Sequence, residues 1–431
     1  MKEATILSSI FVFDTVASMA HIIRSLIVLF FITFLLFITV ITVYSPTEVT
    51  SEQRPLTVFP SLPSTVTDLQ AFFQQIDNWA TDRMHYRQLL ISEFNKYRLK
   101  LGLSPLHNVM AGRDRWLFYT KDGELEDARG TTVFTPTELA HWKAYLLYRN
   151  QIIQQRGATF VFVLLPNKST VYADYLPAHL TQLSNQTRLQ QLSDAMKDTP
   201  VTVVDARPIL LSAKQQGAQV FLKSDTHWNL LGANFVQFAI AKELTKTHPT
   251  ITPILYSYHN ATAEEYLQLR HPSDLNFLMG LQETDHGPIV PVVENIGRCT
   301  DQANPEGIRI WPLALGDCSR KVPSRVAEHW SHLTEEHRAS LFRSTDNPDR
   351  QLSLLMIHDS FFEMLQPFFS NQFKHVDYVG IGRPIEMGAW DAMLDIARPD
   401  IVIEEMIERH LKSTVPRPGI DYPATDSMPI N

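Results

Sequence analysis

The sequence predicts an α/β protein with a mostly parallel sheet in a three-layer arrangement. Short apolar runs, typical of strands buried on both faces, alternate with stretches whose apolar residues recur at helical spacing. The runs lie at 158–166, 201–206, 352–357, 375–382 and 400–406, and the helical stretches at 138–155, 180–196, 229–244 and 361–369. Because strands and helices alternate along the chain, we expect helices on both faces of one sheet.

Two regions lack this alternation. The segment from about 250 to 350 reads as an irregular insertion with a helix of its own near 263–268. Before the first strand, apolar residues at helical spacing over 69–97 predict one or two amphipathic helices that pack on the main domain. A role at a membrane surface is the alternative for these helices.

The N-terminal region predicts a membrane anchor. Residues 25–44 contain no charge, and twenty residues at 1.5 Å each are the length needed to cross a hydrocarbon layer of about 30 Å. A buried helix of a soluble protein is the alternative, but the run is dense in β-branched and aromatic residues and is followed by Ser-Pro. Arg24 precedes the run and Glu48 follows it, which favours a cytoplasmic N-terminus. No small-residue cleavage site follows, so we expect an uncleaved anchor, with Met19 as an alternative start.

These features divide the chain into five parts. We predict a cytoplasmic segment over 1–24, the anchor over 25–44, a linker over 45–68, the main domain over 69–415 with its insertion, and a tail over 416–431. This division places the main domain outside the cytoplasm.

Composition and cysteine usage narrow the function. A formal net charge of −8 over 431 residues argues against a nucleic-acid-binding protein, which normally has a basic face. The two cysteines, Cys299 and Cys318, lack the spacing of a zinc site. In an oxidising compartment we expect them to form a disulfide, and two free thiols are the alternative.

Two segments carry residues suited to nucleophilic catalysis. KSDTHWNLLGA places Asp225 and His227 just before a predicted helix, and LLMIHDSFFEML places Ser360 between a strand and a helix. A serine hydroxyl becomes a good nucleophile when a histidine takes its proton, and a carboxylate fixes the tautomer of that histidine. Both segments fall at strand-to-helix turns, where the carboxyl edge of a parallel sheet forms sites.

Each of these residues has a simpler alternative. Ser360, Asp225 and Asp359 are all good helix N-caps. Asp225 and His227 could also bind a metal ion, but the sequence offers no clear third ligand, so we predict no metal and no cofactor.

The order of these motifs resembles the alginate O-acetyltransferase family of the AlgJ and AlgX type, which has a permuted SGNH-hydrolase-like domain. Asp-Thr-His-Trp followed far downstream by Asp-Ser-Phe is the most specific part of the resemblance. Four weaker pieces agree in order: GRDRWLFY, FVLLPNKSTVYADYLP, SDLNFLMGL and RPDIVIEEMIERHL. The resemblance covers roughly 77–411.

The resemblance implies a role for each matching residue. Ser360 is expected to be the nucleophile, His227 the general base and Asp225 the carboxylate that orients the base, while Trp228 is expected to pack against the histidine or the substrate. This sequence departs from the family pattern in having His358 where the family usually has glycine before Asp-Ser.

The oxyanion hole is the second departure. The asparagine that helps form the oxyanion hole in ordinary SGNH enzymes has no match in the last strand. Arg383 is a candidate replacement, with an ordinary surface turn residue as its alternative.

The expected function is O-acetyl transfer to hydroxyls of an exported cell-surface polysaccharide through a serine acyl-enzyme. The resemblance implies a membrane-bound O-acyltransferase as the source of the acetyl group, and a single-pass protein of the bacterial inner membrane with its domain in the periplasm. An acetyl-esterase with the same triad is the nearest rival. A non-catalytic polysaccharide-binding subunit of an export complex is a rival of another class. Which polysaccharide is modified, whether alginate, cellulose or another glycan, stays open.

Overall fold

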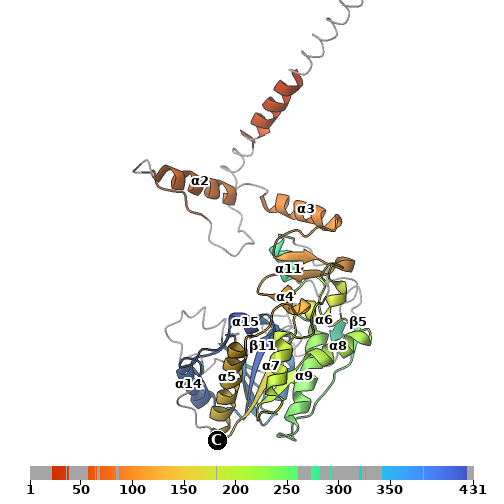
Figure 1. Ribbon diagram of the computed structural model, residues 1–431, viewed down its shortest axis with the longest axis vertical. Helices are drawn as coiled ribbons and strands as arrows, with labels where there is room; N and C mark the ends of the chain where they lie inside the picture. Colours follow the sequence, from red (N-terminus) through yellow and green to blue (C-terminus); the bar gives the residue numbers. More distant parts are fainter. Residues whose placement is uncertain are drawn as a thin grey trace, which may run out of the picture. The chain divides into compact units, whose positions relative to one another are not determined.

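The structure, a computed structural model, describes residues 22–34, 36–37, 57–63, 65, 68–83, 87–180, 182–260, 273–281, 291–293, 320–322, 326, 342–381 and 383–424 (Figure 1). The chain divides into two compact units, Met1–Tyr97 and Arg98–Asn431. Cys299, Cys318 and the helix predicted near 263–268 lie outside the described residues.

Two helices form where amphipathic helices were predicted over 69–97. Helix α2 covers Leu69–Arg83 and helix α3 begins at Arg87 and ends at Lys100. The preceding segment is tied to α2, because the backbone N–H of Thr57 donates to the Asp82 carboxylate at 2.8 Å. The expectation of one or two helices is confirmed, whereas their packing on the main domain stays a prediction.

Within the described residues, no helix combines the length and apolar character needed to span a bilayer. The predicted anchor lies in part outside these residues, at position 35 and over 38–44.

The second unit is built on a seven-stranded mixed sheet with the strand order β4-β3-β11-β9-β10-β8-β7. The first five strands in this order run parallel, while β8 is antiparallel to β10 and β7 is antiparallel to β8. The strands are β3 (Thr159–Leu165), β4 (Thr202–Asp205), β7 (Arg320–Val322), β8 (Phe342–Asp346), β9 (Ser353–Ile357), β10 (His375–Val379) and β11 (Ile401–Ile407). The mostly parallel sheet predicted from the apolar runs is confirmed.

Helices cover both faces of this sheet, as predicted (Figure 1). One face packs against α6 (Lys168–Val171), α8 (Arg207–Gln215), α9 (Leu230–Leu244) and α13 (Gln366–Gln372). The other packs against α5 (Pro136–Gln154), α7 (Arg188–Met196), α14 (Met387–Ala397) and α15 (His410–Ser413). Side chains alternate along β3, so that Val161 and Val163 enter the first core and Phe162 and Leu164 the second.

Smaller elements surround the sheet. They are β1 (Val109–Ala111), η2 (Arg113–Arg115), β2 (Leu117–Tyr119), α4 (Glu124–Arg129), η3 (Ala173–Tyr175), β5 (Tyr258–Asn260), α11 (Asp274–Leu278) and β6 (Pro291–Val293). Strands β1 and β2 pair with each other, as do β5 and β6.

Several elements differ from the sequence expectation. Helix α7 begins at Arg188 rather than near 180, and neither α8 nor α14 was predicted. The stretch predicted as one helix over 361–369 is a short 3₁₀ helix, η6 (Ser360–Met364), followed by α13. In addition, the segment interpreted as an insertion supplies β8 and the edge strand β7 to the main sheet.

The double-sided burial of β3 gives a testable prediction. Leu164 is completely buried, whereas Leu183 is 64% exposed. Leu164→Ala should lower the free energy of unfolding by about 2–5 kcal/mol, because the lost methyl groups leave a cavity in a packed core. The matched change Leu183→Ala should alter it by less than about 0.5 kcal/mol. Urea unfolding of the full chain measures both, and equal losses would contradict the assigned core.

Candidate active site

The two predicted catalytic segments meet at the carboxyl edge of the sheet. Ser360 is the first residue of η6, which begins two residues beyond the end of β9, and Asp225 and His227 precede α9. Nε2 of His227 lies 2.8 Å from Oγ of Ser360, and Nδ1 of His227 lies 2.7 Å from Oδ1 of Asp225. Ser360 is exposed, whereas the side chains of His227 and Asp225 are 13% and 4% exposed. The structure therefore brings the three predicted residues together as a Ser–His–Asp triad.

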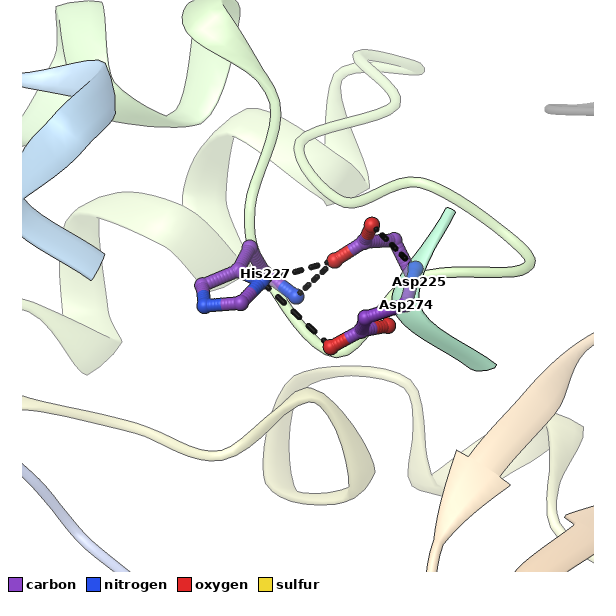
Figure 2. A group of neighbouring side chains, drawn as sticks. All are labelled: Asp225, His227 and Asp274. Carbon is purple, nitrogen blue, oxygen red and sulfur yellow. Dashed lines mark hydrogen bonds and ion pairs between the residues drawn. The ribbon is translucent and has the colours of Figure 1, made fainter. Parts of the chain in front are cut away.

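Asp225 is held by three hydrogen bonds. Its Oδ1 accepts from the backbone N–H of His227 at 2.9 Å as well as from the ring, and its Oδ2 accepts from the backbone N–H of Asp274 at 3.0 Å (Figure 2). The cap of α9 is Asn229, whose side chain accepts from the Gly232 N–H. The alternative that Asp225 caps this helix is therefore wrong.

The ionisation of the pair suits a general base. Burial opposes ionisation of Asp225, but its bond to His227 and the charge of that ring outweigh burial and hold the pKa of Asp225 well below its usual range. For His227, burial lowers the pKa, but the bond to Asp225 and the charges of Asp225 and Asp274 raise it above 6.5 overall. The carboxylate thus stabilises the imidazolium that forms when the ring takes a proton.

A second buried carboxylate, Asp359, fixes the turn that presents Ser360. Its Oδ1 accepts from the Phe361 N–H at 2.9 Å, which caps η6, and its Oδ2 accepts from the N–H of Ile407 in β11 at 3.0 Å. The Asp359 N–H in turn donates to Glu405 of β11 at 3.2 Å. The predicted capping role of Asp359 is confirmed, and Ser360 itself is not the cap.

Trp228 supports the same turn and offers no surface to a substrate. Its side chain is completely buried, and its indole N–H donates to the Phe361 carbonyl at 2.9 Å. The Phe361 ring lies with its centroid 4.8 Å from that of His227. The prediction that Trp228 contacts substrate is therefore wrong, because the ring is enclosed by the core.

His358 does not crowd the triad. Its ring packs on Phe362 at a centroid distance of 4.1 Å, and its Nδ1 lies 2.8 Å from the Asp359 carbonyl oxygen. His358 is also not among the residues with positive φ, so the turn does not require the glycine that the family usually has there.

Arg383 stays a prediction as an oxyanion donor. It is exposed and follows β10, the neighbour of β9. It lines a surface depression together with Glu386 and Arg417, and no triad residue lines that depression. In the described part of the chain, no hydrogen bond or ion pair joins Arg383 to the triad.

Two residues without a predicted role, Lys168 and Asp274, contact the segment that carries Asp225 and His227. Lys168 is fully buried, and its ammonium donates to three backbone carbonyls, including that of Asp225 at 2.6 Å. Asp274 lies on α11, with Oδ2 3.5 Å from Nδ1 of His227. Their only signal in the sequence is that they lie in two of the stretches that resemble the family, at Pro-Asn-Lys and Ser-Asp-Leu.

Asp225, His227 and Asp274 lie close enough together for a metal ion, with ligand atoms within 4.8 Å of one another. Their hydrogen bonds favour acid–base chemistry instead. Nδ1 of His227 faces Asp225, and the Asp274 oxygens accept from the backbone N–H and the hydroxyl of Thr226. We therefore assign the cluster to proton transfer.

An exposed serine, a histidine and a buried carboxylate at the edge of a parallel sheet define an α/β protein with the geometry of a nucleophilic triad. Residues 109–307 match the family described as "SGNH hydrolase-like domain, acetyltransferase AlgX". This match and the two curated relatives below confirm the predicted AlgJ/AlgX-type resemblance. The matched part includes Asp225 and His227 and ends before Ser360.

The chain is similar in sequence to curated relatives over part of its length. The chain is 29% identical over 138 residues to the "Probable alginate O-acetylase AlgJ" of Pseudomonas putida and 31% identical over 144 residues to that of Pseudomonas aeruginosa. Each match covers 32% of this chain and 34% of the relative, so the chain spans about a third of the length of these relatives.

Among solved structures, Bacillus cereus PatB1 is 15% identical with a TM-score of 0.42, over 70% of this chain and 96% of that one. The O-acetyltransferase domain of Pseudomonas putida AlgJ is 17% identical with a TM-score of 0.38, over 70% and 92%.

The corrected role of Trp228 can be tested. Trp228→Phe should lower the free energy of unfolding by about 1–3 kcal/mol, because the buried Phe361 carbonyl loses its donor. It should also slow the reaction of Ser360 with phenylmethylsulfonyl fluoride, since the turn loses a support. Trp142→Phe is the matched control: Trp142 is equally buried and donates to the Leu411 carbonyl at 3.1 Å. It should lose similar stability and keep the labelling rate. Equal labelling rates for the two variants would contradict the assignment.

Proposed function

We propose that this protein is an O-acetyltransferase that transfers acetyl groups, through Ser360, to hydroxyls of an exported cell-surface polysaccharide. The observation that carries the proposal is the continuous hydrogen-bonded chain from Ser360 through His227 to Asp225. The family match and the names of the curated relatives support acetyl transfer over other reactions of a serine triad. Alginate is the polymer named in those relatives, and a polysaccharide of that class is the proposed acceptor.

The mechanism is a double displacement. Nε2 of His227 takes the proton of the Ser360 hydroxyl while Oγ attacks the acetyl carbonyl. Collapse of the tetrahedral intermediate breaks the bond to the donor's leaving group, which takes the proton from His227. A sugar hydroxyl then gives its proton to His227 and attacks the acyl-enzyme, and the proton returns to Oγ as the acetylated sugar leaves. Asp225 keeps the ring in the required tautomer throughout.

Charge develops on the carbonyl oxygen in both steps. The backbone N–H of Ser360, at the start of η6, is the first proposed donor to this oxyanion. Arg383 is the proposed second donor, since it follows the strand next to β9.

The proposed location and donor follow from the N-terminal region. We place the protein in the bacterial inner membrane by a single N-terminal span, with the second unit in the periplasm. The uncharged run over 25–44 and the apolar side chains of the helical residues 22–34, such as Phe30 at 71% exposure, support an anchor. Because acetyl-CoA is cytoplasmic, we propose that a membrane-bound O-acyltransferase supplies the acetyl group.

Acetylation of Ser360 tests the enzymatic proposal. Brief treatment of the full chain with p-nitrophenyl acetate should add one acetyl group to Ser360, which peptide mass spectrometry detects. Ser360→Ala should abolish this label and lower acetyl turnover by about 10⁴-fold or more, because the nucleophile is absent. A folded wild-type chain that stays unlabelled would overturn the proposal.

The molecule that accepts the acetyl group, a sugar or water, distinguishes a transferase from an esterase. With a mannuronate oligosaccharide present, the labelled enzyme should lose its acetyl group to the sugar faster than to water. Loss to water alone would instead identify an acetyl-esterase. Intact polymer acetylation in cells carrying Ser360→Ala would identify the non-catalytic alternative.

Fractionation of cells tests the proposed location. The full chain should remain in the membrane pellet after alkaline carbonate washing, because about twenty apolar residues make insertion effectively irreversible. In spheroplasts, added protease should degrade the second unit. Release by carbonate, or protection of that unit from protease, would contradict the proposed topology.

A further inference from the structure

Asp274 places a second carboxylate beside His227. It lies on α11, outside the two segments that carry the triad. Its Oδ2 lies 3.5 Å from Nδ1 of His227, and its backbone N–H donates to Oδ2 of Asp225 at 3.0 Å. Figure 2 shows both carboxylates on the Nδ1 side of the imidazole ring. The residue therefore contacts both buried members of the triad.

The orientation of this carboxylate is set by the residue between the two triad members. Oδ1 of Asp274 accepts from the Thr226 N–H at 2.8 Å, and Oδ2 accepts from the Thr226 hydroxyl. The same hydroxyl lies 3.3 Å from Nδ1 of His227. Two hydrogen bonds thus hold the Asp274 side chain in place, although 35% of it is exposed.

The charges around His227 are of both signs. Asp225 and Asp274 favour its protonated form, while Arg409, whose guanidinium lies 5.2 Å from the centre of the Phe361 ring, opposes it. Buried Lys168 carries a positive charge that interacts with both aspartates. Burial and the neighbouring Asp225 raise the pKa of Asp274 to about 6, so it is ionised above that pH.

We infer that Asp274 is a positioning residue that holds Asp225 through its backbone and shares with it the stabilisation of the His227 imidazolium. This inference rests on the proposed acyl transfer through Ser360. As Oγ attacks, its proton moves to Nε2 and a positive charge appears on the ring. Two carboxylates near Nδ1 then face that charge, and neither of them needs to accept the proton.

The pH dependence of Ser360 sulfonylation tests this role. In the full chain, phenylmethylsulfonyl fluoride reacts when Oγ attacks sulfur, fluoride leaves and His227 takes the proton. The rate therefore rises with pH as His227 loses its resting proton. Asp274→Asn keeps the shape of the side chain but removes its charge. It should shift this rise to lower pH by about one unit, because an ionised carboxylate within 4–6 Å raises a histidine pKa by about that amount.

The plateau rate should also fall several-fold, since the imidazolium of the transition state loses one stabilising charge. A structural defect alone would lower the plateau without moving the midpoint pH. Asp274→Glu, which keeps the charge, should restore a midpoint close to that of the wild type. Asp194→Asn removes an exposed charge on α7 and should change neither quantity.

Thr226→Val provides an independent variant in case Asp274→Asn unfolds. It removes the hydroxyl that holds Oδ2 but keeps both carboxylates, and it should give a smaller shift in the same direction. Unshifted midpoints in the folded variants would overturn the inference. A wild-type chain that is not sulfonylated at Ser360 would overturn the proposed function instead, so the two failures are distinguishable.

Discussion

The hydrogen bond between Nε2 of His227 and Oγ of Ser360 is the interaction on which the site depends, and it joins residues 133 positions apart. Neither segment can position the other through local geometry, so each is fixed by its own buried carboxylate. Asp225 holds the base loop through two backbone N–H groups and the ring of His227. Asp359 holds the serine turn against β11. The parallel sheet provides the common frame, because it brings the ends of β9 and β11 to one edge.

The turn that presents Ser360 is fixed in part by Glu405, one of two glutamates buried in the central strand β11. Glu404 and Glu405 are consecutive residues of β11, and each is only 1% exposed. They point to opposite faces: Glu404 accepts from the Tyr145 hydroxyl at 2.6 Å, and Glu405 accepts from the Asp359 N–H. Burial raises the pKa of Glu404 to about 7 and that of Glu405 well above its usual range. Two adjacent buried carboxylates cannot both be ionised at low cost. Because Glu405 is neutral, Asp359 keeps its negative charge.

Much of this fold could be predicted because β3 and β9 are buried on both faces and therefore read as apolar runs, and β11 begins with the apolar residues Ile401, Val402 and Ile403. Strand β8, with the largely polar sequence FRSTD, gives no such signal and was missed. Periodicity also could not separate η6 from an α-helix, because the tight turn depends on the bonds of Asp359. Within the site, the triad followed from motif order. Asp274 did not, since its contacts with Thr226 and Asp225 span 48 and 49 positions and leave no local pattern.

The burial of Trp228 changes how the Asp-Thr-His-Trp motif is understood. The motif places four side chains in one short loop, and these side chains point in different directions and make different contacts. Asp225 and His227 form the hydrogen-bonded chain that leads to Ser360. Trp228 points inward and donates to the carbonyl of Phe361, the residue after the nucleophile. Thr226 faces Asp274. One loop thus contacts the serine through its histidine and the backbone next to the serine through its tryptophan. The spacing between base and nucleophile is therefore fixed at two points, the 2.8 Å contact of His227 with Ser360 and the 2.9 Å bond of Trp228 to the Phe361 carbonyl.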